Sequence, residues 1–169
     1  SKNNTQDGNS ILVTTAKGII EKIDVADKYG VNDKIIYAGQ NDPVTITINP
    51  IVYSSQVGII ADNINVFVYL PDTLTIDVQT GDKNYSIASK DGITDKDGNS
   101  LSYNVYKYSY TEDEILKNNG SIPVLKIHAN VSVDTKDNTL SNIYATIDGT
   151  VKVNNQKYSI NTPSKNRIS

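Results

Sequence analysis

The chain has 169 residues, of which 37% are hydrophobic and 21% are charged, so one domain of this length can bury a substantial core. The formal net charge is -3 at pH 7 and the lysines are scattered, which argues against a nucleic-acid partner. Cysteine is absent, and this excludes disulfide bonds, thiolate metal sites and a cysteine nucleophile.

The two ends of the chain differ in composition from its middle. Residues 1–9 contain no apolar side chain and residues 161–169 are nearly as polar, so we expect linkers or frayed ends there, flanking a single domain over residues 10–160. No apolar run approaches the roughly 20 residues that span a bilayer, and no cleavable signal is visible. Because residue 1 is not a start methionine, we expect neighbouring domains, an export signal and an anchor in a larger chain.

Alternation of apolar and polar residues predicts β-strands along most of the chain, and therefore an antiparallel sheet with one wet face. The expected strands are Ser10–Thr15, Ile19–Val25, Lys34–Ala38, Val44–Val52, Ile64–Leu70, Thr73–Val78, Tyr85–Ala88, Leu101–Tyr110, Pro123–Val133, Thr139–Ile147 and Thr150–Ile160, the last broken by a turn at Asn154-Asn155.

One short helix interrupts the strands. Thr111 and Glu114 have the spacing of a capping box, in which each side chain bonds the backbone of the other residue. Lys117 suits the C-terminal end of the helix dipole, and Gly120 offers a left-handed stop. We therefore expect a helix near residues 112–117.

The strand alternation also predicts the core. In the run from Leu125 to Val133, every second residue is apolar, so Lys126 and His128 are expected on the opposite, polar face. Similar faces recur in three other strands, enough to cover two packed sheets. The predicted core is aliphatic, which leaves the 11 tyrosines mostly for strand rims and outer faces.

The loop over residues 91–100 is the candidate metal site. Asp95, Asp97 and Asn99 have the spacing of the first three side-chain ligands of a calcium loop. The rest of that pattern is missing, because Ser100 replaces the turn glycine and Tyr106 replaces the closing glutamate. A β-hairpin turned by Asp97-Gly98-Asn99 is the simpler interpretation, and no other cofactor is expected.

Two further candidates concern catalysis and ligand binding. His128, the single histidine, is expected to be a solvated residue on a strand face, with no nucleophile or acid assigned beside it, so we expect no enzyme. Tyr106, Tyr108 and Tyr110 share one strand face and form the candidate ligand-binding strip for a sugar or a protein. The alternative is that these rings shield a sheet face or pack under the helix.

Several segments resemble the conserved repeat modules of bacterial and archaeal wall proteins. The resemblance is carried by Asn41–Ile48, Asn65–Thr75, Ile122–Val131 and Thr139–Ile147. Those modules show a "D-x-V-x-h-x-h" strand, a "V-x-V-x…L-P-x-x-L-T" corner and a late "h-x-N-x-A-x-V" strand. The resemblance implies an Ig-like sandwich in an exported cell-surface protein, where it serves as an adhesin or stalk.

A second resemblance is to cohesins, which are jelly-roll modules that bind dockerins. It is carried by Phe67–Leu74, similar to their "h-h-Y-D-P-x-x-L" corner, and by Gly120–Ile127; Leu70 stands where aspartate is usual. Sandwich modules of Gram-positive surface proteins can also carry a lysine-asparagine isopeptide bond, for which Lys22 or Lys126 with Asn142 would serve. Since strand lysines are normally solvated, we expect no such bond here.

The sequence therefore predicts an all-β, Ig-like or jelly-roll antiparallel β-sandwich. The expected function is a non-catalytic adhesion or stalk module of a secreted or cell-surface bacterial protein, with a protein or glycan ligand at the cell surface or cell wall. The alternatives are a cohesin-like scaffold and a carbohydrate-binding module.

Overall fold

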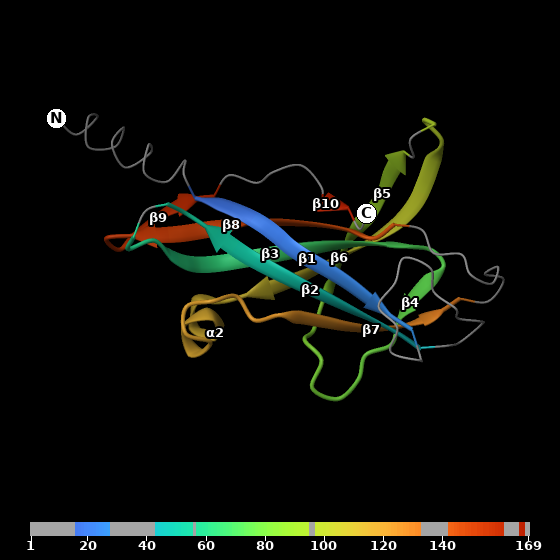
Figure 1. Ribbon diagram of the computed structural model, residues 1–169, viewed down its shortest axis with the longest axis horizontal. Helices are drawn as coiled ribbons and strands as arrows, with labels where there is room; N and C mark the ends of the chain where they lie inside the picture. The colour runs from blue at the N-terminus through green and yellow to red at the C-terminus, as the bar shows by residue number, and fades with distance from the viewer. Residues whose placement is uncertain are drawn as a thin grey trace.

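The computed structural model describes residues 16–27, 43–55, 57–94, 97–132, 142–160 and 166–167. These residues form an all-β sandwich of two antiparallel sheets packed against each other, with one short helix (Figure 1). The elements are β1 (Lys17–Ala26), β2 (Pro43–Tyr53), β3 (Ile60–Pro71), β4 (Leu74–Ile76), β5 (Ser86–Thr94), β6 (Ser100–Tyr110), α2 (Glu112–Lys117), β7 (Leu125–Val131), β8 (Tyr144–Val153), β9 (Gln156–Ser159) and β10 (Asn166–Arg167).

The two sheets differ in size. Among the described residues, the smaller sheet has four strands in the order β1-β2-β7-β4. The larger has six, in the order β10-β8-β3-β6-β5, with β9 paired to β8. Among the described strands the chain changes sheet from β2 to β3, from β3 to β4, from β4 to β5, from β6 to β7 and from β7 to β8.

Burial follows the predicted alternation. In β7, Leu125, Ile127, Ala129 and Val131 are buried, whereas Lys126 is exposed. In β3, the buried side chains of Ile64, Val66, Val68 and Leu70 alternate with half-buried ones. The strand faces proposed from the sequence are confirmed, because a period of two matches the pleat.

The prediction that tyrosines stay outside is wrong for four of them. Tyr108 and Tyr110 lie in the main core, next to the aliphatic residues of β3. Tyr103 and Tyr144 form a second buried cluster with the half-buried Tyr69, and the rings of Tyr103 and Tyr144 meet edge to face with centroids 5.5 Å apart. The Tyr103 hydroxyl donates to the carbonyl oxygen of Asn142 at 2.6 Å, so its polar end is satisfied.

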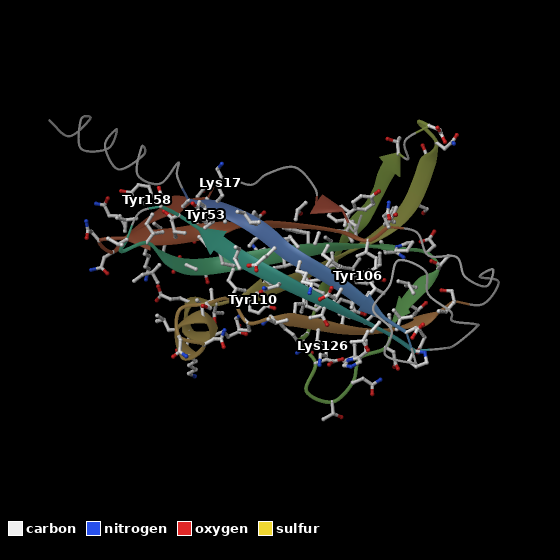
Figure 2. The ribbon with its side chains drawn as sticks, viewed as in Figure 1. Lys17, Tyr53, Tyr106, Tyr110, Lys126 and Tyr158 are labelled. Atoms are coloured by element: carbon white, nitrogen blue, oxygen red, sulfur yellow. The ribbon has the colours of Figure 1, made fainter. Side chains whose placement is uncertain are left out.

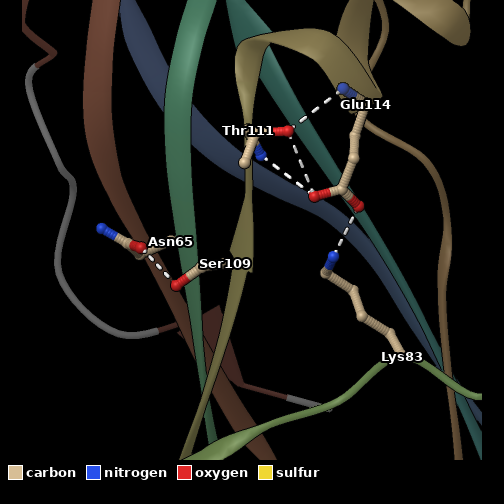
Figure 3. A network of polar contacts seen from close by, with 5 residues as sticks. All are labelled: Asn65, Lys83, Ser109, Thr111 and Glu114. Atoms are coloured by element: carbon tan, nitrogen blue, oxygen red, sulfur yellow. Dashed lines mark hydrogen bonds and ion pairs between the residues drawn. The ribbon is translucent and has the colours of Figure 1, made fainter.

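The helix has the predicted bounds and caps. The backbone N–H of Glu114 donates to Thr111 Oγ1 at 3.2 Å, and the backbone N–H of Thr111 donates to Glu114 Oε1 at 3.2 Å (Figure 3). Gly120, with φ of +81°, follows the helix end, and its N–H donates to the carbonyl oxygen of Ile115. The helix is therefore closed at both ends, as the capping-box motif predicts.

The C-terminal strands depart from the predicted boundaries. β8 runs continuously through Asp148 and Gly149, where two strands were expected to meet. The turn at Asn154-Asn155 is confirmed, because both residues have positive φ, as a two-residue hairpin requires. β10 pairs with Tyr144 and Ala145 of β8, although its residues fall in the expected polar tail. The strands expected at Ser10–Thr15 and Lys34–Ala38 lie outside the described residues.

No helix in the described part of the chain is long and apolar enough to cross a membrane.

Candidate functional site

The tyrosine strip predicted on β6 is not an exposed surface. Register pairs Tyr106 with Val68, Tyr108 with Val66 and Tyr110 with Ile64, and all three partners point into the core. Tyr108 and Tyr110 are 2% and 3% exposed, and Tyr106 is half-buried against them. The prediction of an exposed strip is therefore wrong, and the alternative of core packing holds.

The edge of this aromatic row is covered by a neighbouring ring. Tyr85 lies edge to face on Tyr106, with ring centroids 5.0 Å apart, and is tilted against Tyr108 at 5.9 Å. Burial raises the pKa of the Tyr106, Tyr108 and Tyr110 phenols above the ordinary value of 10.0, because the anionic form loses its solvation. Tyr108 and Tyr110 therefore belong to the core, and Tyr106 is only partly exposed beside them.

The candidate calcium loop lies at the turn of the β5–β6 hairpin, which projects from the sandwich (Figure 1). Thr94 pairs with Ser100, and Gly98 has a φ of +81°, so the hairpin interpretation is confirmed. Asp97 and Asn99 are exposed, and Asp95 lies outside the described residues. In the part of the chain that is described, no three His, Cys, Asp or Glu residues cluster as metal ligands do.

His128 is on the predicted face of β7 but has an acidic partner. Its Nδ1 lies 2.8 Å from Asp82 Oδ2, and its side chain is 32% exposed. The expectation of a solvated histidine with no acid beside it is therefore wrong. Tertiary folding brings Asp82 there from 46 residues away in sequence.

Asp82 belongs to a segment that we call the crossover segment, residues 77–85, which connects β4 of the smaller sheet to β5 of the larger one. Its first residue, Asp77, donates its backbone N–H to the carbonyl oxygen of His128 at 2.8 Å. Lys83 Nζ lies 2.7 Å from Glu114 Oε2 (Figure 3) and 4.3 Å from the centroid of the Tyr110 ring. The segment is thus fastened to both β7 and α2.

The carboxylates of these pairs are held in their charged form. The backbone N–H of Gln79 donates to Asp82 at 2.8 Å and lowers the pKa of that carboxyl; partial burial opposes this effect and His128 adds to it. The bond from Lys83 lowers the pKa of Glu114. Asp82 and His128 form an acid–histidine pair that joins the crossover segment to β7 and thereby anchors that segment.

A second polar cluster surrounds Asp62, whose side chain is only 2% exposed. Its carboxylate accepts from Thr150 Oγ1 at 2.9 Å and Asn63 Nδ2 at 3.1 Å, and lies 3.4 Å from Lys157 Nζ. Burial raises the pKa of Asp62, but the Thr150 bond and the charge of Lys157 together more than offset it, so the pKa is lowered. Lys152 connects this cluster to α2 through an ion pair with Glu112 at 2.7 Å.

The residues considered for an isopeptide bond lie on the surface. Lys22 is exposed and pairs with Asp24 at 3.2 Å, and Lys126 and Asn142 are exposed as well. The structure does not bring either lysine together with Asn142.

One end of the sandwich contains a groove that sequence reasoning missed. β7 begins at Leu125, opposite Ile48, so Ile51–Tyr53 of β2 pair with β1 on one side and with no described strand on the other. In the larger sheet β6 ends at Tyr110, opposite Ile64, and the first residues of β3 pair only with β8 among the described strands. Both sheets therefore lose a strand neighbour at the same end.

Residues 111–124, which are α2 and the connector to β7, occupy the place where those strands stop (Figure 1). A groove of about 800 Å3 remains between the connector, the end of β2 and the start of β3. We call it the β2 groove. It is lined by Asn49, Pro50, Ile51, Val52, Ser54, Ile59, Ala61, Asn118, Gly120, Ser121, Ile122, Pro123 and Val124.

Large apolar side chains are exposed around the β2 groove. Val124 in its lining is 56% exposed, and Tyr53 and Ile60, next to lining residues, are 54% and 45% exposed. Figure 2 shows Tyr53 at the end of the sandwich that also carries Tyr158 and Lys17. Exposed apolar side chains gathered around a hollow are typical of a binding surface.

A signal for this site is present in the sequence only in part. Ile51-Val52-Tyr53 and Ile122-Pro123-Val124 are apolar runs that break the strict alternation of the strands around them. Nothing in either run shows that the two lie side by side.

Comparison with known proteins gives no relative: no protein-family model matches the chain, and no curated protein matches it significantly.

Proposed function

We propose that this protein is a non-catalytic β-sandwich module of a secreted or cell-surface bacterial protein, and that it serves in adhesion or as part of a stalk. The observation that supports an adhesive role best is the β2 groove with its exposed apolar rim, since exposed apolar side chains around a hollow are typical of a binding surface. The sequence resemblance to wall-protein modules supports the cell-surface setting.

The runner-up is a cohesin-like scaffold that docks another protein. The lining of the β2 groove contains no aromatic residue. Because aromatic rings are the usual platforms on which sugars stack, this lining favours a protein-docking scaffold over a carbohydrate-binding module. A scaffold and an adhesin differ in partner, and both require binding without turnover.

The proposal is tested with the purified chain coupled to fluorescent beads. The beads are presented to a glycan array and to a panel of immobilised extracellular and cell-wall proteins. We expect saturable retention on at least one surface, with the retained compound recovered chemically unchanged. Turnover of a retained compound that is lost in both Asp82→Asn and His128→Gln would contradict the non-catalytic role. Absence of retention on every surface would contradict the adhesive role.

A stalk role is tested separately by pulling single molecules from their two ends. We expect one unfolding event at a force well above that of helical proteins, because the sandwich is held by long antiparallel ladders. Unfolding at low force, with extension before rupture, would remove the stalk role.

A further inference from the structure

The open edge of β2 determines the shape of what can bind beside it. The N–H and C=O groups along one side of a strand that has no neighbour remain available for pairing with an extended chain. Ile51–Tyr53 form such an edge, because β1 pairs with their other side and no described strand pairs with this one. Three residues of strand span about 10 Å, enough for a short ladder.

The lining determines the charge of what can bind. The described residues that line the β2 groove include no Asp, Glu, Lys, Arg or His, although 21% of the chain is charged. A charged segment would lose its hydration there without gaining an ion pair. An uncharged segment would lose little and would cover Val124 and Ile51, which are apolar.

The walls are fixed before any partner binds. Ile51 and Val52 pair with Ile19 and Gly18 of β1, and Ala61 of β3 pairs with Val151 of β8. The connector is anchored by Ile122, which is buried in the core, and it is closed internally by the side chain of Asn118, whose Nδ2 donates to the carbonyl oxygen of Ser121 at 2.9 Å. Preformed walls reduce the entropy lost on association.

We infer that the β2 groove binds an extended, uncharged, apolar peptide segment of a partner protein, which pairs with the open edge at Ile51–Tyr53. This rests on the binding role in the proposed function and names the ligand class for it. Backbone pairing gives affinity, and the alternate side chains of the peptide that point into the groove give specificity. The proline at position 50 and the crossing to β3 limit the ladder to a few residues.

The test uses a display library of random decapeptides selected on the wild-type chain and counter-selected on Val124→Lys. The matched control is Val78→Lys, because Val78 is 54% exposed against 56% for Val124 and is not in the groove lining. We expect selected peptides with neutral, apolar cores. Val124→Lys should weaken their binding at least tenfold and Val78→Lys less than twofold, with both variants melting near the wild type.

Strand pairing is tested on the peptides themselves. N-methylation of every second backbone amide removes the donors that face β2, whereas methylation of the others leaves them intact. We expect one alternate set to lose binding at least tenfold and the other to lose much less. Amide exchange at the open edge of β2 should slow when peptide is bound.

The following outcomes of the peptide and glycan tests would overturn the inference. They are no peptide enriched over the Val124→Lys counter-selection, enrichment of charged peptides, equal effects of methylation at all positions, and a glycan that binds wild type but not Val124→Lys. Concentration-dependent self-association lost in Val124→Lys, without peptide binding, would assign the groove to a second copy instead. If beads coated with Val124→Lys adhere as well as beads coated with the wild type, the inference fails and the proposed adhesion stands. If peptides bind the wild type but no surface retains the beads, the inference stands and the proposed adhesion fails.

Discussion

Tyr106, Tyr108 and Tyr110 show how neighbours decide what one residue does. Alternation places the three rings on one face of β6, but it does not say whether that face is inside. The partners Val66 and Val68 on β3 place that face against the core. A tyrosine there buries a large apolar area, so removing its ring leaves a cavity and lowers the stability of the fold.

Changing Tyr106 and Tyr108 together to serine should lower the free energy of unfolding by about 3 kcal/mol or more, because two buried or half-buried rings are lost. Urea denaturation measures this loss. The control is Tyr53→Ser, which removes an exposed ring and should lower stability by less than about 1 kcal/mol. If the double variant were as stable as the control, the rings of Tyr106 and Tyr108 would have to be exposed.

Among the structural elements, the crossover segment is held in place by charged side chains. It joins one sheet to the other, and the contact of Asp82 with His128 and the ion pair of Lys83 with Glu114 hold it against β7 and α2. A second hollow, of about 490 Å3, lies between this segment and the connector that precedes β7. Its lining includes Lys83, Lys126, Asp82 and Glu114, so it is charged where the β2 groove is neutral.

The crossover segment should make stability depend on acid pH. The pKa values of Asp82 and Glu114 are lowered in the folded chain from their ordinary values of 3.8 and 4.5. A carboxyl with a lowered pKa stabilises the fold fully above its ordinary pKa, and this stability is lost as the pH falls through the folded value. Unfolding free energies measured by urea from about pH 6 to about pH 3 should therefore decrease.

Asp82→Asn removes one of these carboxyls and should flatten that dependence. The variant should be less stable than the wild type near pH 6 and should approach it at low pH, where the wild-type carboxyl is itself protonated. Parallel curves for the two proteins across this range would show that Asp82 does not couple the crossover segment to stability.

For the whole molecule, the two sheets approach each other closely at Gly18. A β-carbon at this position would lie 2.6 Å from Cγ2 of Ile147 on the opposite sheet and 2.9 Å from Cδ1 of Ile160. No larger side chain fits there without moving one sheet or repacking Ile147, so glycine is used in a strand despite its low strand preference.

Gly18→Val should therefore lower the unfolding free energy by about 1–3 kcal/mol through overpacking. Lys17→Val, on the exposed side of the same strand, should change it by much less. Adding Ile147→Ala to Gly18→Val should recover part of the loss, since the two side chains compete for one space. Equal losses in the two single variants would contradict a close approach of the sheets at Gly18.

Short sequence patterns predicted most of the strands and the helix. The period-two runs predicted β2, β3 and β7 with their inner faces and β6 as a strand without its inner face, and the capping box predicted α2 with its bounds. These features depend on residues within a few positions of one another, whose geometry the backbone fixes directly. The break expected between Ile147 and Thr150 was wrong, since pairing with β3 carries the strand across Gly149.

The sequence by itself thus determined that the chain is an antiparallel β-sandwich with one capped helix and a core built mainly of aliphatic side chains. The tertiary structure alone decided that Tyr108 and Tyr110 complete that core, that Asp82 meets His128, and that the end of β2 is left open beside the connector. Each of these depends on the register between segments far apart in the chain. Register is set by packing across the whole sandwich, so the sequence of a single strand does not show which residues of other strands it will pair with.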